Sequence, residues 1–374
     1  MNIQEPIVTP LPAARPATHA PLKTGLIGVS GFGVYRRNRM RETGLFNLAV
    51  CYDIKADALA RACEEEGARA ACSVDDLLAE PGLEAVVIST GIDTHAPFAI
   101  KAMERGLHVF LEKPLCGLVE EARRLLEVRD ATGIVFGTGH KDERSTAIDR
   151  LVRRWLEEGR LGTLVSYERN TSHSGGLEIR PGDWRGIADR NPGGMLIQCG
   201  VHALAAIQGL FGPVQSVAAM MRHDAHPGTE TADAANVLLE HGSGLIGTLN
   251  CYHVTAYVHE FRLFGTKGNL YIETHEQRAW FQERRCQMTE TRVEIPFADE
   301  DPLVHCQNLI HWYEAIRDPG KAPRPSLEDG IRAVLPVFAA ERSYRERRTV
   351  SLSEFDLPWP DRAQPVVTAG AGAP

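Results

Sequence analysis

Short apolar runs rich in β-branched residues alternate with helical patterns over residues 24–139, and this alternation limits the possible fold more than any other feature of the chain. Strands separated by a helix-length segment run parallel, because a parallel connection needs a crossover of about a dozen residues or more. The crossover helices then cover both faces of the sheet. We therefore predict a doubly wound parallel sheet. Its strands are Gly25–Val29, Leu48–Tyr52, Ala85–Ser89, His108–Leu111 and Ile134–Phe136, and its helices include Ala56–Glu66, His95–Arg105 and Val119–Thr132.

The pattern changes after Gly139, where a helix over Ser145–Glu158 precedes a run of strands with little helix between them. Glycine-containing turns at 242–244 and 265–268 supply the positive φ that tight hairpins require, so we expect an open, mainly antiparallel sheet. The predicted strands are Gly162–Arg169, Val214–Met221, Ala234–Glu240, Leu245–Tyr252, Phe261–Phe264, Asn269–Glu273, Ala279–Glu283 and Val293–Pro296, and the helices Leu303–Arg317 and Leu327–Tyr344 follow.

The chain is long enough for two domains, since its 374 residues exceed the roughly 150 of an average domain. We expect an α/β protein with the parallel sheet in residues 23–140 and the antiparallel sheet in residues 141–352. Residues 1–22 and 353–374 are rich in Pro and Ala or poor in anchoring side chains, and we expect them to be loose tails.

Composition and charge exclude several classes of function. Forty-one Lys and Arg against 49 Asp and Glu give a formal charge of −8, which repels nucleic acid. No apolar run approaches the roughly 20 residues that span a membrane, and residues 1–21 lack a secretory pattern. No two of the eight cysteines have the two-residue spacing of a zinc site, so we predict no metal and no disulfide framework. A reducing, cytoplasmic location fits this usage.

A glycine-rich turn follows the first predicted strand. Gly28, Gly31 and Gly33 stand where a dinucleotide-binding turn would aim backbone N–H groups at a pyrophosphate. The usual G-x-G-x-x-G spacing would place glycine at position 30, which is Ser30. From the loop alone, a cofactor turn and an ordinary strand-to-helix turn are both open.

An acidic residue ends the second strand and adds weight to the cofactor interpretation. Asp53 follows Gly33 by 20 residues, the interval expected for a carboxylate that accepts hydrogen bonds from ribose hydroxyls. It could also cap the helix that begins at Ala56, and the two roles are compatible. Because a carboxylate repels a 2′-phosphate, we favour NAD over NADP, although neighbouring Lys55 would partly compensate.

The fifth strand runs into Glu112-Lys113-Pro114, and this segment resembles the signature of the glucose-fructose oxidoreductase and inositol dehydrogenase (Gfo/Idh/MocA) family. The resemblance extends from about Lys23 to Leu352. It includes Ser89-Thr90 with Thr94-His95, Trp184-Arg185, Gly193-Gly194 with Gly200-Val201-His202, Phe264 to Gly268, and Ser326 to Gly330.

The resemblance implies a Rossmann domain followed by an α/β domain whose open sheet builds homodimers or homotetramers. It implies nicotinamide-dependent hydride transfer on sugars, cyclitols and related polyols. It makes Lys113 and His202 the catalytic residues, places Glu112 near the nicotinamide, and predicts a cis peptide before Pro114. The candidate cofactor-binding residues are Gly28, Ser30, Gly31, Phe32, Gly33, Asp53, Ser89, Thr90, His95, Glu112 and Lys113.

Oxidising an alcohol requires a base within hydrogen-bond reach of the hydroxyl. A histidine suits this task near neutral pH, whereas a lysine needs a perturbed environment, or else it polarises the carbonyl in the reverse direction. Where the family usually has Asp, this chain has Gln198, four residues before His202, and it has Ala205 where a second Asp is common. We expect Gln198 and His202 to share a helix face, with Gln198 orienting the substrate oxygen.

Three further residues are candidate substrate contacts. His140 ends the sixth strand at the carboxyl edge where open α/β sheets bind ligands, although a helix-cap role is equally compatible. Trp184 and Arg185 lie in a loop that should border the same cleft.

Several functions fit these residues. The first is an NAD(P)-dependent dehydrogenase or reductase of a sugar, cyclitol or related polyol. The alternatives are a dihydrodiol-carboxylate dehydrogenase of aromatic catabolism, a redox-neutral glycoside-processing enzyme that recycles tightly held NAD, and a cofactor-sensing regulator without catalysis. Retention of Lys113 and His202 argues against the regulator, because neither residue is needed merely to bind NAD.

Overall fold

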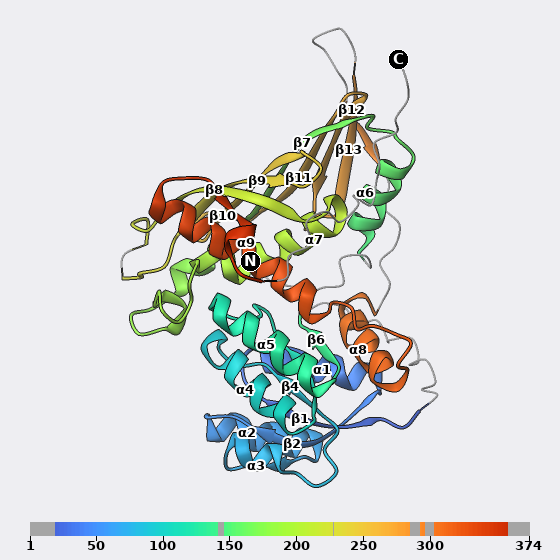
Figure 1. Ribbon diagram of the computed structural model, residues 1–374, viewed down its shortest axis with the longest axis vertical. Coiled ribbons are helices and arrows are strands. Elements are labelled where there is room, and N and C mark those ends of the chain that lie inside the picture. Colours follow the sequence, from blue (N-terminus) through green and yellow to red (C-terminus); the bar gives the residue numbers. More distant parts are fainter. Residues whose placement is uncertain (1–18, 141–145, 227, 285–291, 296–302, 358–374) are drawn as a thin grey trace, which may run out of the picture.

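The computed structural model describes residues 19–140, 146–226, 228–284, 292–295 and 303–357, which form two sheets with helices between and around them (Figure 1). The predicted end points Ser145 and Pro296 and most of the two predicted tails lie outside these residues. No helix in the described ranges is long and apolar enough to cross a membrane.

The first sheet is parallel throughout, with strand order β3-β2-β1-β4-β5-β6. All four residues of its central strand β4 are buried, as expected for a sheet covered on both faces. The chain order is β1 (Leu22–Ile27), α1 (Phe32–Thr43), β2 (Phe46–Tyr52), α2 (Ala56–Glu66), β3 (Arg69–Ala70), α3 (Val74–Leu78), β4 (Ala85–Ile88), α4 (Ile92–Glu104), β5 (His108–Leu111), α5 (Val119–Thr132) and β6 (Phe136–Thr138).

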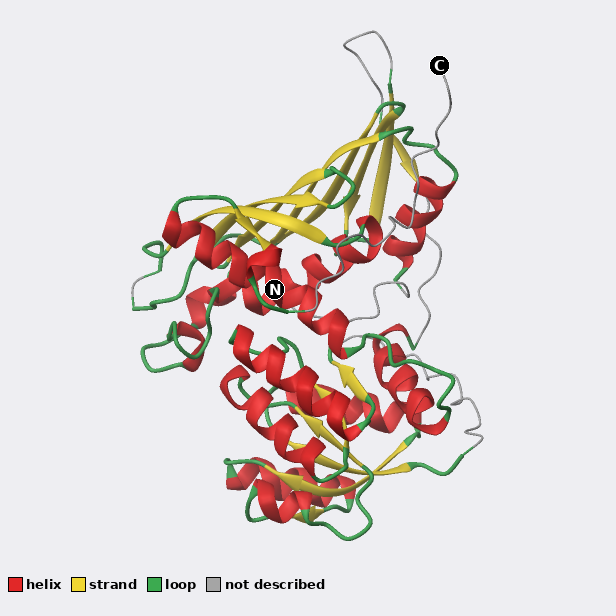
Figure 2. Ribbon diagram, in the orientation of Figure 1, coloured by secondary structure: helices red, strands yellow, loops and turns green. Residues whose placement is uncertain are grey.

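The second sheet has strand order β14-β13-β12-β11-β7-β10-β9-β8-β15, and only the β7–β10 pair is parallel. Helices α6, α7 and α9 lie on one face and leave the other open (Figure 2). The elements are α6 (Ala147–Glu157), β7 (Leu164–Ser172), α7 (Val201–Phe211), β8 (Val214–Arg222), β9 (Ala234–His241), β10 (Ile246–Tyr252), β11 (Val258–Gly265), β12 (Gly268–Glu273), β13 (Arg278–Glu283), β14 (Val293–Ile295), α8 (Gln307–Arg317), α9 (Leu327–Glu346) and β15 (Val350–Ser351).

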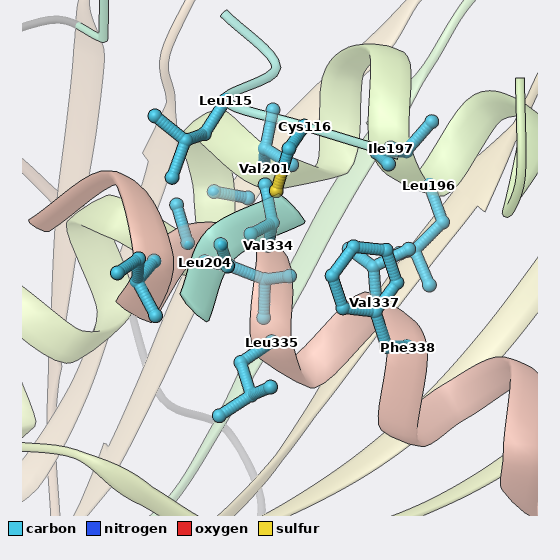
Figure 3. Close-up of a cluster of buried hydrophobic side chains, with 14 of the residues drawn as sticks. Leu115, Cys116, Leu196, Ile197, Val201, Leu204, Val334, Leu335, Val337 and Phe338 are labelled. Carbon is cyan, nitrogen blue, oxygen red and sulfur yellow. The ribbon is translucent and has the colours of Figure 1, made fainter. Parts of the chain in front are cut away.

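One continuous apolar core joins the two sheets. Leu115 and Cys116, on the loop after β5, are fully buried against residues of α7 and α9, including Val201 and Val334 (Figure 3). The loop that carries Lys113 is therefore anchored on both sides by packing. This anchoring holds the carboxyl edge of the first sheet against the start of α7.

A helix from late in the chain packs against the first sheet. Helix α8, from the segment assigned to the second domain, packs against β5 and β6 of the first sheet. Its Trp312 is fully buried, with its ring 5.8 Å from Phe46 and 5.4 Å from Phe110. The parallel sheet needs an apolar cover on this side, and a late segment of the chain supplies it.

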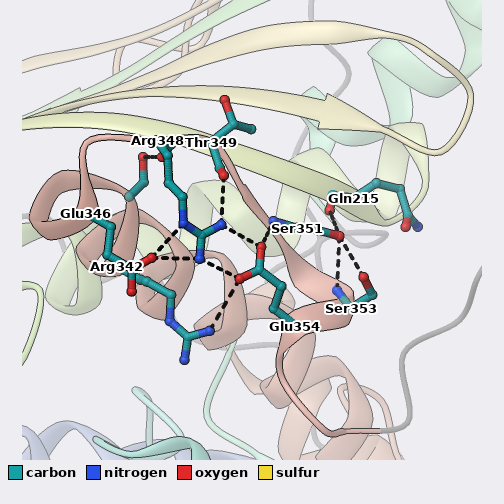
Figure 4. A network of polar contacts seen from close by, with 9 residues as sticks. Gln215, Arg342, Glu346, Arg348, Thr349, Ser351, Ser353 and Glu354 are labelled. Atoms are coloured by element: carbon teal, nitrogen blue, oxygen red, sulfur yellow. Dashed lines mark hydrogen bonds and ion pairs between the residues drawn. The ribbon is translucent and has the colours of Figure 1, made fainter.

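Residues at the inner ends of the two predicted tails are packed into the protein. Strand β1 starts at Leu22, which is fully buried, and Phe355 near the other end is also buried. A polar network fixes the final described segment (Figure 4). In it, Arg348 donates two hydrogen bonds to Glu354, at 2.8 and 2.6 Å, and the Ser351 N–H donates to the same carboxylate at 3.0 Å.

Candidate active site

The turn between β1 and α1 brings two backbone segments together so closely that only glycine fits. A Cβ at Gly28, which has φ +86°, would lie 2.3 Å from the Ser89 carbonyl oxygen, and a Cβ at Gly33 would lie 2.1 Å from the Gly28 carbonyl oxygen. Gly31 has φ 55° and begins α1 without a side-chain cap. Positive φ values therefore fall at Gly28 and Gly31 and not at residue 30, so the turn does not require glycine in place of Ser30.

This turn has the features of an anion-binding helix start. The N–H groups of the first turn of α1 have no side-chain cap, and the helix dipole favours negative charge there. The buried Ser89 hydroxyl has no hydrogen-bond partner among the described residues and lies beside Gly33. Phe32 is 50% exposed at the same helix start. These residues fit a dinucleotide phosphate.

Asp53 organises the glycine turn. Its Oδ2 accepts hydrogen bonds from the N–H groups of Val29 and Ser30, both at 2.9 Å, and its Oδ1 accepts one from Lys55 at 2.9 Å. Burial raises the pKa of Asp53, but the hydrogen bonds from Lys55, Ser30 and Val29 outweigh burial and leave the pKa below its ordinary value. Helix α2 has Lys55 as its N-cap, so the expected capping role of Asp53 is replaced by a hydrogen bond within the turn.

Lys113 joins the two sheets at the carboxyl edge of β5. The Lys113–Pro114 peptide is cis, as expected, and Lys113 Nζ donates a hydrogen bond to the Gln198 backbone carbonyl at 3.0 Å. The ammonium also lies 6.0 Å from the ring centroid of Phe32. Lys113 is therefore placed between the glycine turn and the segment that precedes α7.

Two predicted cofactor residues, His95 and Thr90, have hydrogen-bond partners within the protein. His95 is 1% exposed, with Nδ1 2.7 Å from the Pro114 carbonyl oxygen and Nε2 3.1 Å from the Thr90 carbonyl oxygen. Burial lowers the pKa of His95 despite these contacts. The Thr90 hydroxyl accepts a hydrogen bond from Thr94 at 2.7 Å. His95 thus ties the loop after β4 to the Lys113 loop.

Glu112 is buried in an ion pair with Arg36 of α1, and both side chains are at most 3% exposed. Its other oxygen accepts a hydrogen bond from the Lys113 N–H at 3.2 Å. The Arg36 guanidinium also lies 4.7 Å from the Phe110 ring centroid. Glu112 therefore fixes the backbone beside Lys113 by bonds inside the protein.

His140 and His202 face each other at the junction of the two sheets, with ring centroids 6.1 Å apart. Burial, followed by the positive charge of Lys113, lowers the pKa of His140 to about 3, so His140 is neutral near neutral pH. Its Nε2 has no hydrogen-bond partner in the described part of the chain. The N-cap of α6 is Thr146, so His140 does not have the helix-cap role that the sequence left open.

Gln198 lies in a π-helical turn, Leu196–Gly200, that precedes α7. The sequence predicted an ordinary helix with Gln198 and His202 on one face, and the wider π turn changes that register. Gly200 permits the close packing, because a Cβ there would lie 3.0 Å from Cys251 Sγ. The Gln198 side chain donates a hydrogen bond from Nε2 to Asn191 Oδ1 at 2.6 Å.

Trp184 and Arg185 form a short 3₁₀ turn at the border of this region. The Trp184 ring packs against the main core, and Arg185 is paired with Asp183 at 2.6 Å. Arg185 contributes to the low pKa of His253, which burial lowers most. The Arg185 backbone carbonyl accepts a hydrogen bond from Asn191.

The structure adds residues that the sequence analysis did not select. His173 Nε2 lies 3.2 Å from Cys199 Sγ, and the His173 and His253 rings are 5.2 Å apart. Burial lowers the pKa of His173 and raises the pKa of Cys199, and the positive charge of Lys113 has a smaller, lowering effect on both. No local sequence signal marks these residues, because the adjacent ends of β7 and β10 bring His173 and His253 together, and Cys199 comes from the π-helical turn before α7.

No cluster of potential metal ligands occurs in the part of the chain that the structure describes. The site can hold an anionic dinucleotide at the start of α1, and it places the Lys113 ammonium and the neutral His140 imidazole next to it. This combination is suited to proton transfer coupled to a redox step.

Comparison with known proteins gives the family. Residues 22–140 match the family model described as oxidoreductase family, NAD-binding Rossmann fold, and residues 150–271 match the GFO/IDH/MocA C-terminal domain. The chain is 28% identical over 285 residues to scyllo-inositol 2-dehydrogenase (NAD(+)) of Bacillus subtilis, covering 74% of this chain and 80% of that protein. It is 22% identical over 340 residues to myo-inositol 2-dehydrogenase of Thermotoga maritima, covering 89% and 99%.

Solved structures show the same fold. Levoglucosan dehydrogenase in complex with NADH superposes with a TM-score of 0.78 at 19% identity, covering 89% of this chain and 99% of that one. The first family model spans the parallel sheet, and the second covers the other sheet as far as residue 271, within β12. The chain is thus a member of the Gfo/Idh/MocA family of NAD-binding oxidoreductases.

Proposed function

We propose that this oxidoreductase transfers a hydride between NAD and a secondary hydroxyl or carbonyl carbon of a sugar, cyclitol or related polyol, with Lys113 and His202 handling the proton. The observation that carries the proposal is the 3.0 Å contact of Lys113 Nζ with the Gln198 carbonyl oxygen. This contact holds the ammonium of one domain against the turn that leads into His202. The names of the inositol dehydrogenases above support the substrate class.

The chain's own groups divide the work as follows. The N–H groups at the start of α1 bind the pyrophosphate, and Asp53 accepts hydrogen bonds from the ribose through its remaining lone pairs. When bound, the nicotinamide supplies the hydride acceptor or donor. Lys113 or His202 takes the hydroxyl proton during oxidation and returns it during reduction. The neutral His140 ring faces His202 and adds no competing charge.

A substrate panel tests the proposal. Purified protein is incubated with NAD or NADP and with scyllo-inositol, myo-inositol, levoglucosan or a cyclic dihydrodiol carboxylate, while nicotinamide absorbance is followed. We expect reduction of NAD with at least one sugar or cyclitol. Tight NADH binding without reduction of NAD or NADP by any of these compounds would contradict the proposal. Mass spectrometry of the same samples would reveal a redox-neutral conversion of the substrate.

Asp53→Ala is expected to raise the Kd for NADH about tenfold or more, because the change removes a ribose acceptor and the group that holds three N–H groups of the turn. The discrimination between NADH and NADPH should fall with it. Because the pKa of Asp53 lies below its ordinary value, the carboxylate stays charged above about pH 5, and NADH affinity should not titrate with this group there.

Fluorescence titration of both coenzymes measures this effect. Asp57→Ala, at a 73% exposed side chain on α2, is the control and should leave both Kd values unchanged. An unchanged NADH affinity in Asp53→Ala would remove Asp53 from the proposed site.

We further propose that two copies of the chain associate through the open face of the second sheet. Met220, Leu238 and Ile246 are 69%, 60% and 56% exposed, and the strand registers place them on one face. The opposite face is covered by helices. An apolar sheet face of this kind is typical of a protein interface.

Light scattering after size-exclusion chromatography tests the association. The protein should have at least twice the mass of one chain, and Leu238→Asp should lower the mass to that of a monomer. Leu118→Asp, at a 56% exposed position before α5, is the matched control and should not change the mass. A wild-type monomer at micromolar concentration would rule out this interface.

A further inference from the structure

Gln198 is held by a chain of hydrogen bonds that begins at a backbone carbonyl. Asn191 Nδ2 donates to the Arg185 carbonyl oxygen at 2.8 Å, and Asn191 Oδ1 accepts from Gln198 Nε2 at 2.6 Å. Asn191 is fully buried, whereas Gln198 is partly exposed. The Lys113 ammonium binds the Gln198 backbone carbonyl, so this residue is fixed through both its backbone and its side chain.

Chemistry determines which end of each amide faces which partner. A backbone carbonyl only accepts hydrogen bonds, so the Asn191 atom that faces Arg185 is the NH₂ nitrogen. The Asn191 oxygen therefore faces Gln198, and an oxygen requires a donor opposite it. Gln198 must present its own nitrogen to Asn191, which leaves Oε1 as the remaining end of the amide. Among the described residues, none donates a hydrogen bond to this Oε1.

We propose that Asn191 is a positioning residue that orients Gln198 so that Oε1 accepts a hydrogen bond from a substrate hydroxyl beside Lys113. The inference rests on the proposed function of the site. Without this anchor, the Gln198 amide could rotate and present either a donor or an acceptor. With the hydrogen bond to Asn191, Gln198 presents one neutral acceptor, Oε1. The site then favours substrates with a hydroxyl donor at this point over analogues that lack the hydroxyl.

A double-mutant cycle tests the inference on the polyol that the wild-type protein oxidises best. Asn191→Ala should raise the KM for that polyol about tenfold, the effect of one hydrogen bond, and leave the Kd for NADH unchanged. In a Gln198→Ala background, adding Asn191→Ala should change the KM less than about twofold, because Asn191 acts only through Gln198. Multiplicative effects of the two substitutions would overturn the inference.

Thr231→Val is the matched control. Thr231 Oγ1 donates to the same Arg185 carbonyl oxygen at 3.2 Å, and no hydrogen bond joins Thr231 to Gln198 in the described part of the chain. This variant loosens the loop as Asn191→Ala does, so both should lower the Tm, but only Asn191→Ala should raise the KM. An equal rise in KM from Thr231→Val would show that Asn191 serves only to stabilise the loop. Asn191→Ser replaces Asn191→Ala if the alanine variant does not fold.

A second readout separates this inference from the proposed function. If the wild-type protein oxidises no polyol, the proposed function fails, and the hydrogen bond is then examined by NMR of NADH-bound protein labelled with ¹⁵N in glutamine side chains. The Gln198 signal is assigned by its loss in Gln198→Ala. Its side-chain protons should exchange slowly in the wild type and rapidly in Asn191→Ala. Equal exchange rates in both would refute the positioning role.

Discussion

Lys113→Met is expected to lower kcat about a thousandfold while the Kd for NADH changes less than about twofold. General acid–base groups contribute roughly 10²–10⁴ in rate, and methionine has a similar length but can neither take nor give a proton. The ammonium contacts the Gln198 carbonyl and faces the Phe32 ring, and neither contact is needed to hold the coenzyme phosphates. Steady-state kinetics with the preferred polyol and fluorescence titration with NADH measure the two quantities separately.

Lys101→Met is the control for this experiment. Lys101 lies on α4, is 50% exposed and pairs with Asp75 at 3.1 Å, so its replacement removes the same charge away from the site. Its kcat should equal that of the wild type. A kcat for Lys113→Met within about threefold of wild type would refute the catalytic assignment and leave His202 as the remaining base.

Glu112→Ala is expected to destabilise the protein by about 3–5 kcal/mol, because it leaves the Arg36 guanidinium buried without its carboxylate. For a chain of this length, a loss of this size should lower the Tm by roughly 5 °C. The double variant Arg36→Met with Glu112→Met should recover much of the loss, since paired apolar residues remove both buried charges together. Calorimetry of the coenzyme-free protein measures these changes.

The exposed pair Arg61–Asp57 provides the comparison for Glu112→Ala. Its side chains are 66% and 73% exposed, and such a pair contributes at most about 1 kcal/mol, so Arg61→Ala should leave the Tm nearly unchanged. If Glu112→Ala also left the Tm unchanged, the Arg36–Glu112 pair would not be needed for the fold. The remaining role of Glu112 would then be to accept the hydrogen bond from the Lys113 backbone N–H.

Local sequence patterns predicted most of the first sheet. Helices α2 and α5 begin and end at the predicted residues, and β5 matches His108–Leu111. The shortest elements were not predicted. Strand β3 has two residues and helix α3 has five, which are too few to show a periodicity. Strand β6 lies at Phe136–Thr138, two residues beyond its predicted start, because pairing with β5 sets its register.

The candidate site was predictable only in part. The glycine turn and Asp53 follow from spacing along the chain, and the Lys113 loop follows from the resemblance of Glu112-Lys113-Pro114 to the family signature. The Arg36–Glu112 pair, the His95–Pro114 contact and the Asn191–Gln198 hydrogen bond join residues that are 76, 19 and 7 positions apart. No pattern of spacing distinguishes these partners from other polar residues.

The amino-acid sequence by itself determined the family, the parallel sheet and the glycine turn, because periodicity, turn chemistry and motif spacing act over a few neighbouring residues. Only the tertiary structure decided that α8 returns to cover the first sheet and that a π-helical turn replaces the expected regular helix at Gln198. It also decided which end of the Gln198 amide is left for a ligand. These outcomes depend on which buried surfaces and polar atoms come into contact in the folded protein. Packing between segments far apart in the chain determines these contacts.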